Sequence, residues 1–141
     1  MTLGYTTGVF DMFHIGHLNI LRRSKSLCDE LIVGVSTDKL VRTEKEVSVI
    51  IPFEERAEIV KSINYVNKVV EQTSYDKVEA WKRLRFDVMF VGDDWKGTKK
   101  WLTLEEEFAM LNVRIEYLPY TRHTSSTKLR KVVENKYRGI L

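Results

Sequence analysis

The 141-residue sequence has few residues that cross-link a chain or interrupt helices and strands: it has one cysteine, two prolines and seven glycines. A lone cysteine, Cys28, cannot form a disulfide within the chain, which excludes a disulfide-stapled fold and favours a reducing, cytoplasmic location. With 43% hydrophobic and 30% charged residues, the composition excludes collagen-like, low-complexity and disordered chains. We expect one soluble domain over residues 1–141, with Cys28 as a small core residue.

Long apolar runs and a strong charge of one sign are also missing. No run of about 18 apolar residues occurs, and residues 1–5 lack the basic-then-apolar pattern of a secretion signal. The 23 Lys and Arg against 20 Asp and Glu leave a net charge of +3. An RNA-binding domain is suggested only by the pI of about 8.9, and no aromatic platform accompanies a basic stripe. We therefore expect neither a membrane nor a nucleic acid as partner.

Short β-branched runs alternate with segments of helical periodicity, which is typical of a parallel sheet with crossover helices. Strands are expected over residues 3–9, 30–36, 67–71, 87–92 and 113–118. Helices are expected over residues 15–26, 52–63, 75–84, about 102–111, and 125–136. This order predicts a Rossmann-like α/β fold, a three-layer α/β/α arrangement around a five-stranded parallel sheet. Residues 42–51 and 93–100 are expected to be loops at the ligand-binding carboxyl edge.

The segment between the first strand and the first helix reads Thr6-Thr7-Gly8-Val9-Phe10-Asp11-Met12-Phe13-His14-Ile15-Gly16-His17. Its glycines permit close backbone approach, and the free N–H groups of a helix N-terminus favour a phosphate. His14 and His17 are three positions apart at that N-terminus, so both can present a ring N–H to a phosphate oxygen. Without further support, two such histidines are more often a helix cap and a surface residue.

The string His14-Ile15-Gly16-His17 resembles the HxGH signature of the nucleotidyltransferase superfamily, in particular the cytidylyltransferase branch that includes glycerol-3-phosphate cytidylyltransferases. Class I aminoacyl-tRNA synthetases share these letters, but this length leaves no room for their anticodon-binding parts. Three further segments are similar to family motifs in the same order: Ser36-Thr37-Asp38, Val91-Gly92-Asp93-Asp94-Trp95-Lys96-Gly97 and Thr124-Ser125-Ser126-Thr127-Lys128. The resemblance covers nearly the whole chain and implies a single nucleotidyltransferase domain.

The resemblance implies attack by a phosphorylated alcohol on the α-phosphorus of a nucleoside triphosphate. Such an alcohol is already close to a dianion at neutral pH, so the enzyme must position anions and absorb charge. The catalytic candidates implied are His14, His17, Lys45, Arg56, Ser126 and Thr127. The nucleotide-binding candidates are Thr7, Gly8, Val9, Phe10, Asp11, His14, Gly16, His17, Gly92, Asp94, Thr121, Arg122, Ser125, Ser126 and Thr127. Magnesium is the implied cofactor, held mainly by the triphosphate, with Asp11 as an optional neighbour.

Several candidates also have a plain structural interpretation. Lys45 lies in a charge run that usually faces water, and Arg56 can pair with an acidic helix neighbour. Asp11 can form a turn, and the Ser/Thr cluster can cap the last helix. Trp95 is expected to pack its loop, and residues 99–101 to form a solvated helix start. The family is commonly dimeric, which implies a homodimer, with the apolar residues Val47, Val49, Ile50 and Ile51 as contact surface or as core.

Two regions depart from the cytidylyltransferase pattern. Tyr120 stands where the family has an arginine, and Arg122 is a candidate replacement. The segment 125–130 resembles the ISSTxxR motif of adenylyltransferases as closely as it resembles the cytidylyltransferase motif, and Arg130 occupies the final arginine position. The part that would select the alcohol also differs, at Asn64, at Tyr75 and in a longer loop from residue 96 to 107.

The expected function is transfer of CMP from CTP to a small phosphorylated alcohol, glycerol 3-phosphate first among them. The products would be a CDP-alcohol, for cell-surface polymer or capsule synthesis, and pyrophosphate. An adenylyltransferase that uses ATP is one alternative. A non-catalytic nucleotide-binding module, which would bind without turnover, is the other.

Overall fold

The computed structural model describes residues 1–119 and 125–140. Its strands are β1 (Leu3–Gly8), β2 (Glu30–Ser36), β3 (Lys68–Gln72), β4 (Val88–Gly92) and β5 (Arg114–Leu118). The helices of this part are α1 (Ile15–Ser26), α2 (Asp38–Lys45), α3 (Phe53–Lys61), α4 (Lys77–Leu84), α5 (Lys99–Ala109) and α6 (Ser126–Ile140), with a 3₁₀ turn η1 (Asp93–Trp95).

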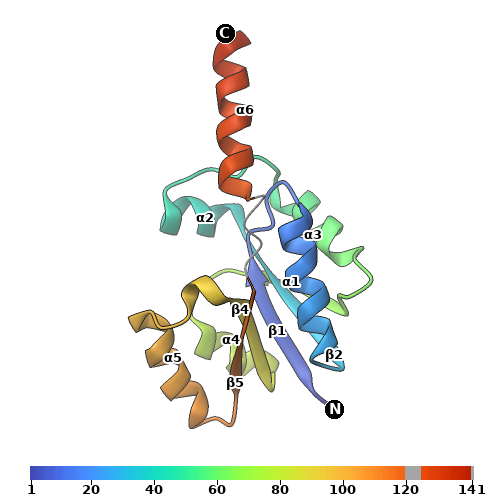
Figure 1. The fold of residues 1–141 in the computed structure, drawn as a ribbon, viewed down its shortest axis with the longest axis vertical. Helices are drawn as coiled ribbons and strands as arrows, with labels where there is room; N and C mark the ends of the chain where they lie inside the picture. The colour runs from blue at the N-terminus through green and yellow to red at the C-terminus, as the bar shows by residue number, and fades with distance from the viewer. Residues whose placement is uncertain (120–124, 141) are drawn as a thin grey trace.

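The five strands form one parallel sheet in the order β3-β2-β1-β4-β5. The chain moves outward from β1 through β2 to β3 and then returns to β4 on the other side of β1. Helices α1 and α3 therefore cover one face of the sheet, and α4 and α5 cover the other (Figure 1). The predicted Rossmann-like three-layer fold is confirmed. Sheets of this kind bind ligands beyond the carboxyl ends of the strands where the order reverses, here between β1 and β4.

Alternation along the strands builds a core on each face. Successive strand residues point to opposite faces, so Leu31, Val33 and Val35 pack beneath α1 and α3, whereas Ile32 packs beneath α4 and α5. Cys28 is partly buried against the first of these clusters, and its thiol donates to the carbonyl oxygen of Ser24 at 3.3 Å. Its expected role as a small core residue agrees with this packing.

Helix α2 is absent from the helices expected from the sequence. The loop expected from residue 42 begins only after Lys45, because Thr37 caps the helix by accepting the N–H of Leu40 and the helix ends at Glu46, which has a left-handed φ of 57°. With only two buried apolar residues, Leu40 and Val41, this helix has too little periodicity to be recognised in the sequence. Helix α5 also begins earlier than expected, at Lys99.

Helix α6 projects from the carboxyl edge of the sheet (Figure 1). Ser125 caps it, accepting the N–H of Lys128 at 3.1 Å as the Ser/Thr cluster predicts. The apolar residues Leu129, Val132 and Val133 of this helix belong to neither core cluster, and Val132 is 52% exposed. None of the helices in the described ranges is long and apolar enough to cross a membrane.

Candidate active site

The turn from β1 into α1 is tight and strained. Phe10 and Met12 have positive φ values of 56° and 49°, a region that side chains other than glycine seldom adopt and that is enriched at functional sites. A side chain at Gly8 would meet the Phe10 ring at 2.9 Å. Glycine at this position therefore lets the Phe10 ring fold back over the strand end, where its centroid lies 5.2 Å from that of His17.

His14 and His17 are held by their own backbone. His14 is the N-cap of α1, and its Nδ1 accepts the N–H of Gly16 at 3.0 Å, while Nδ1 of His17 accepts the N–H of His14 at 3.2 Å. The two rings stack with centroids 3.9 Å apart. Because each Nδ1 is an acceptor, each ring carries its proton on Nε2. The two histidines can therefore cap the helix and donate to a phosphate at the same time. The cap uses Nδ1 of each ring, and the Nε2–H of each ring can be donated to a phosphate oxygen.

Burial keeps both imidazoles neutral. Desolvation lowers the pKa of His14. The pKa of His17 is lowered to about 3, by desolvation first and by the neighbouring His14 second, against the opposing effect of Asp11. A neutral ring with a fixed Nε2–H donates a hydrogen bond and takes up no proton near neutral pH. The pair is therefore suited to binding phosphate oxygens and unsuited to acting as a general base.

The N-terminus of α6 lies against this turn. The Ser126 hydroxyl donates to the carbonyl oxygen of Asp11 at 2.6 Å, and its Oγ lies 3.5 Å from Nε2 of His17. Thr127 is exposed. Two segments that the sequence separates by more than a hundred residues, the HxGH string and the Ser-Ser-Thr string, thus meet at one place.

Asp11 is a buried anchor of the turn. Its carboxylate accepts the N–H groups of Ile50 and Ile51 at 2.8 and 2.9 Å, and it pairs with the Arg130 guanidinium at 3.1 Å. Burial raises the pKa of this carboxyl, but these hydrogen bonds and Arg130 outweigh burial and lower it overall. Both carboxylate oxygens are engaged, so Asp11 does not fit the optional place beside magnesium. Within residues 1–119 and 125–140, no group of three His, Cys, Asp or Glu side chains is arranged to hold a metal ion.

Arg56 lies beneath the site instead of over it. The side chain is 1% exposed, and its guanidinium donates to the carbonyl oxygens of Val9, Ser36 and Ile51 at 2.6, 2.8 and 2.8 Å. It also pairs with Asp38, the last residue of the Ser-Thr-Asp string, at 2.5 Å. Arg56 therefore clamps the carboxyl ends of β1 and β2 to the loop before α3. In this conformation it is a positioning residue, which differs from the place over the reacting phosphates that the family match implies.

A cationic cluster that the sequence does not reveal lies on the other side of β1. The ammonium groups of Lys45, Lys77 and Lys100 lie 5.8, 5.4 and 5.9 Å from the centre of the Tyr75 ring. Lys77 also donates to the hydroxyl of Thr7 at 3.3 Å. Lys100 is exposed at the start of α5, as expected of a solvated helix start, and its charge adds to this cluster. Trp101 beside it is core, which the expectation of a solvated segment did not foresee.

The remaining candidates lie at the same edge. Gly92 ends β4 and Asp94 is exposed in η1, which places the family-like loop beside the β1 turn. Trp95 is 48% exposed, with its ring 6.4 Å from that of Trp101, so it packs its loop only in part. Thr121 and Arg122 lie outside the described residues, as does Tyr120.

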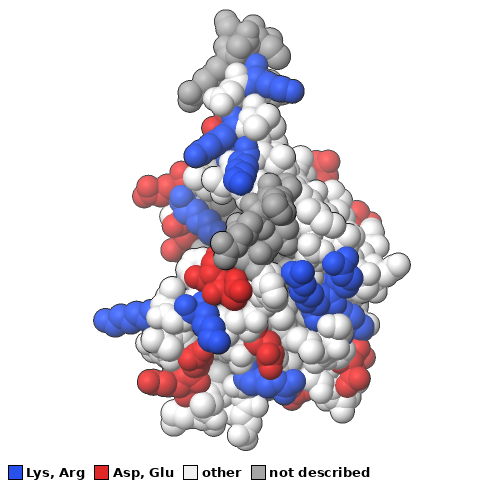
Figure 2. Space-filling view, in the orientation of Figure 1, with Lys and Arg blue, Asp and Glu red and all other residues white. Residues whose placement is uncertain are grey.

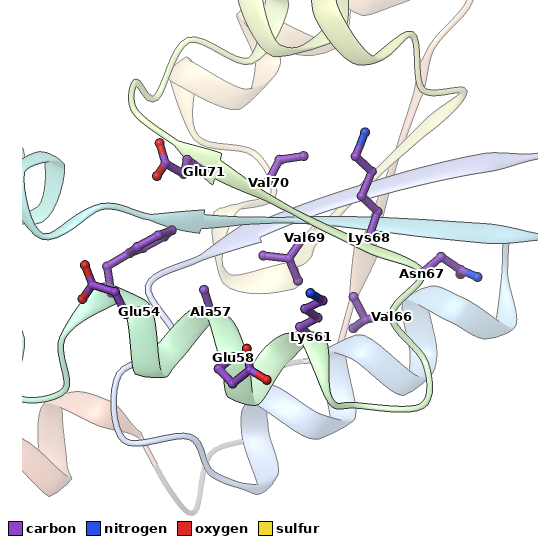
Figure 3. Close-up of a pocket in the computed structure, with 11 residues that line it drawn as sticks. Glu54, Ala57, Glu58, Lys61, Val66, Asn67, Lys68, Val69, Val70 and Glu71 are labelled. Carbon is purple, nitrogen blue, oxygen red and sulfur yellow. The ribbon is translucent and has the colours of Figure 1, made fainter.

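The described part of the chain has cavities beside α3 and between α4 and α5. One, of about 440 Å³, lies between α3 and the edge strand β3 and contains none of the candidate residues (Figure 3). The other, of about 590 Å³, includes Tyr75 and Lys77. On the face shown in Figure 2, basic and acidic side chains are interspersed over the body, and basic ones continue along α6. Among its described lining residues, the second cavity has none of the candidate residues and reaches the cationic cluster through Tyr75, Lys77 and Lys100.

A Rossmann-like sheet with two donor histidines at its first helix, faced by a Ser-capped helix, is the arrangement of a nucleotidyltransferase-type protein. The chain belongs to the cytidylyltransferase-like family, whose model matches residues 5–132. This membership confirms the family that the motifs indicate.

Relatives of this chain are named for two different enzyme activities. The chain is 35% identical over 127 residues to glycerol-3-phosphate cytidylyltransferase of Bacillus spizizenii, covering 89% of this chain and 92% of that protein. It is 38% identical over 131 residues to FAD synthase of Pyrococcus horikoshii, covering 90% and 86%. Among solved structures, the lipopolysaccharide core biosynthesis protein of Thermoplasma volcanium has a TM-score of 0.72 and 24% identity, over 88% of this chain and 99% of that one, which supports the fold alone. Family membership therefore defines the superfamily and does not define the substrates.

Proposed function

We propose that the protein transfers CMP from CTP to a small phosphorylated alcohol, with glycerol 3-phosphate as the first candidate. The observation that carries this proposal is the pair of neutral imidazoles, His14 and His17, fixed as Nε2–H donors at the N-terminus of α1. Such donors have a use where negative charge grows on phosphate oxygens, and a simple binding module has no need of them.

In the proposed reaction, an oxygen of the acceptor phosphate forms a bond to the α-phosphorus of CTP. The bond from that phosphorus to the oxygen bridging to the β-phosphorus breaks, and pyrophosphate leaves with the electron pair. Because the acceptor phosphate is already ionised, no proton has to be removed from it. The protein therefore has to bind two anions side by side and stabilise the charge that moves to the leaving group.

Charges near the turn suit this task. His14 and His17 donate to the triphosphate, and Thr127 presents an exposed hydroxyl at the positive end of the α6 dipole. The Ser126 hydroxyl donates to the Asp11 carbonyl oxygen and has to leave it to reach a phosphate oxygen. Lys45 is exposed at the end of α2, as expected of a residue in a charge run, and its pKa is lowered by desolvation first and then by the charges of Arg130 and Lys100. An anion bound among them would relieve that repulsion. Magnesium, in this proposal, arrives with the triphosphate, whose oxygens hold it.

ATP in place of CTP is the second candidate. Arg130, at the final position of the adenylyltransferase-like motif, reaches the turn and pairs with Asp11, and the FAD synthase relative is as similar to this chain as the cytidylyltransferase is.

The cytoplasmic location, the homodimer and a product destined for a cell-surface polymer or capsule remain proposals that rest on the family resemblance. Val47 and Ile50 are exposed in the loop after α2 and fit a contact surface better than a core.

The test is pyrophosphate release by the purified protein with magnesium, each of the four nucleoside triphosphates, and a panel that includes glycerol 3-phosphate, phosphorylated polyols and flavin mononucleotide. A His17→Ala protein purified in parallel controls for contaminating enzymes. Turnover with CTP and a phosphorylated alcohol is expected. Turnover only with ATP would make the second candidate correct, and nucleotide binding without turnover across the panel would favour the binding module.

A further inference from the structure

We propose that Asp11 and the N-terminal part of α6 form a latch, closed in this conformation, which opens when a nucleoside triphosphate binds and thereby moves α6. The latch consists of the hydrogen bond from Ser126 to the Asp11 carbonyl oxygen and the ion pair between Arg130 and the Asp11 carboxylate. That the ligand is a nucleoside triphosphate rests on the proposed function. That the same donors cannot serve Asp11 and a phosphate fully at once rests on the contacts themselves.

The Ser126 hydroxyl has a single proton to donate. It donates this proton to the carbonyl oxygen of Asp11 at 2.6 Å, and its Oγ lies 3.5 Å from Nε2 of His17. Because His17 carries its ring proton on Nε2, the hydroxyl and the ring, both donors suited to a phosphate, face each other and the backbone. A phosphate oxygen can accept from Ser126 only after the hydroxyl has left Asp11.

Arg130 is incompletely satisfied by the latch. Its guanidinium pairs with Asp11 at 3.1 Å, but its Nε is buried without a hydrogen-bond partner in the described part of the chain. A buried N–H without an acceptor is costly. Burial first, and then the charge of Arg130, lower the pKa of Lys45, so the two cations also repel each other. A triphosphate offers both cations more negative charge than one carboxylate and an acceptor for Nε, so it competes with Asp11 for Arg130.

Asp11 stays hydrogen-bonded when Arg130 leaves. Its two carboxylate oxygens accept the N–H groups of Ile50 and Ile51 at 2.8 and 2.9 Å, and hydrogen bonds of this kind favour the ionised carboxylate. Each oxygen therefore keeps one donor after the guanidinium has gone. The turn can survive opening of the latch, and the cost of opening is the ion pair and the hydrogen bond from Ser126.

Helix α6 is built to move as one body. Its apolar residues Leu129, Val132 and Val133 belong to neither core cluster, and beyond its first turn the helix projects away from the sheet (Figure 1). With 15 residues the helix is about 22 Å long. A small rotation at its first turn therefore carries its far end much further. Opening of the latch converts a local exchange of donors into a displacement of the end of α6.

The experiment measures the distance between spin labels on the full chain, at Lys136→Cys on α6 and at Lys82→Cys on α4, with Cys28→Ser to prevent labelling elsewhere. Both labelled positions are exposed. CTP and ATP are each added with magnesium, and inorganic tripolyphosphate is added as the phosphate chain without a nucleoside. Calorimetry on the labelled protein measures whether each of them binds. We expect bound CTP to change the distance by at least about 5 Å, given the length of the helix.

Two variants distinguish the latch from a general change of charge. Asp11→Asn removes the carboxylate that holds Arg130 and keeps the backbone carbonyl. Without nucleotide, its label distance should already shift toward the CTP-bound value. Its Kd for CTP should fall at least about threefold, because the ligand no longer has to break the ion pair. Glu134→Gln, which removes an exposed carboxylate from the same helix, should alter neither quantity. A melting curve checks that Asp11→Asn is folded.

The proposal is wrong if CTP or ATP binds and the label distance stays the same in the natural site, a result that does not depend on the folding of any variant. It is also wrong if folded Asp11→Asn binds CTP no more tightly than before, or if Glu134→Gln behaves like Asp11→Asn. Failure of the proposed function looks different: tripolyphosphate, or a nucleotide that is never turned over, would still move α6. Absence of binding by all three anions would overturn the latch and the proposed function together.

Discussion

The carboxylate of Asp11 meets the guanidinium of Arg130 at 3.1 Å, although 119 residues separate them in the chain. Together with the hydrogen bond from Ser126 to the Asp11 carbonyl, this contact ties α6 to the turn that holds the histidines. Apart from its first turn, α6 projects away from the body (Figure 1). Asp11 is therefore the residue that brings the Ser-Ser-Thr string to the HxGH string.

Asp11→Asn is expected to lower the free energy of unfolding by about 3 kcal/mol, because the variant leaves a buried charge without its partner and an amide cannot accept all the hydrogen bonds that the carboxylate accepts. Urea denaturation measures the loss. In a double-mutant cycle, Arg130→Met should cost much less in the Asp11→Asn background than in the natural chain. Additive losses would show that the two side chains are not coupled.

Substitutions at His14 separate its two roles. His14→Ala removes both the cap and the Nε2–H, whereas His14→Asn keeps an acceptor that caps helices well. Both variants should lower kcat at least about a hundredfold, as loss of one preorganised donor does, but only His14→Ala should lower Tm appreciably. Steady-state pyrophosphate release and a melting curve on each variant provide the comparison. Normal turnover in His14→Asn would mean that the histidine acts only as a cap.

Arg56→Met tests the clamp beneath the site. Three carbonyl oxygens, those of Val9, Ser36 and Ile51, lose a donor, and that of Ser36 is buried. We expect a loss of about 3 kcal/mol in the free energy of unfolding. Arg22→Met, at an exposed arginine on α1, should cost less than about 0.5 kcal/mol. A stable Arg56→Met protein that has lost only kcat would restore the role over the phosphates.

Acid should destabilise the protein through His17. Its folded pKa of about 3 lies below the ordinary value of 6.5, so between these limits the unfolded chain binds a proton that the folded protein excludes. The free energy of unfolding should then fall by up to about 1.4 kcal/mol for each pH unit below 6.5. His17→Gln, which can still accept the His14 N–H, should show a shallower fall between pH 6.5 and 4.5 in urea denaturation. Equal slopes in the two proteins would contradict the buried, neutral state of His17.

The dependence of stability on pH between 7 and 10.5 tests the burial of Lys77. Burial first, and then Lys100 and Lys45, lower its pKa from 10.5 to about 7. Between pH 7 and 10.5 the unfolded chain binds more protons, so the stability contributed by this group rises with pH and its unfavourable effect is largest at pH 7 and below. Lys77→Met should therefore raise Tm at pH 7 and flatten the rise in stability toward pH 10, with Lys82→Met as control. A lower Tm at pH 7 would show that the ammonium group is well accommodated without a ligand.

The regular elements could be predicted because their signals are local. The apolar run of β2 and the periodicity of α1 predict both elements with the bounds that the structure has. Helix α2 was missed, since a short helix with two buried residues leaves almost no period to detect. Asn64, a position expected to select the alcohol, lies exposed in the turn before β3, at the edge of the sheet opposite the histidines, so a match in sequence did not place it at the site.

The amino-acid sequence by itself determined the alternation of strands and helices, the turn with its two histidines and the family, because each depends on residues close together in the chain. Only the tertiary structure decided what the charged residues do. Arg56 is a clamp, Asp11 an anchor and Lys77 a buried cation, because the strand order and packing set which charges lose water and which partners they meet. Burial of this kind depends on contacts between distant segments, and no local pattern encodes it.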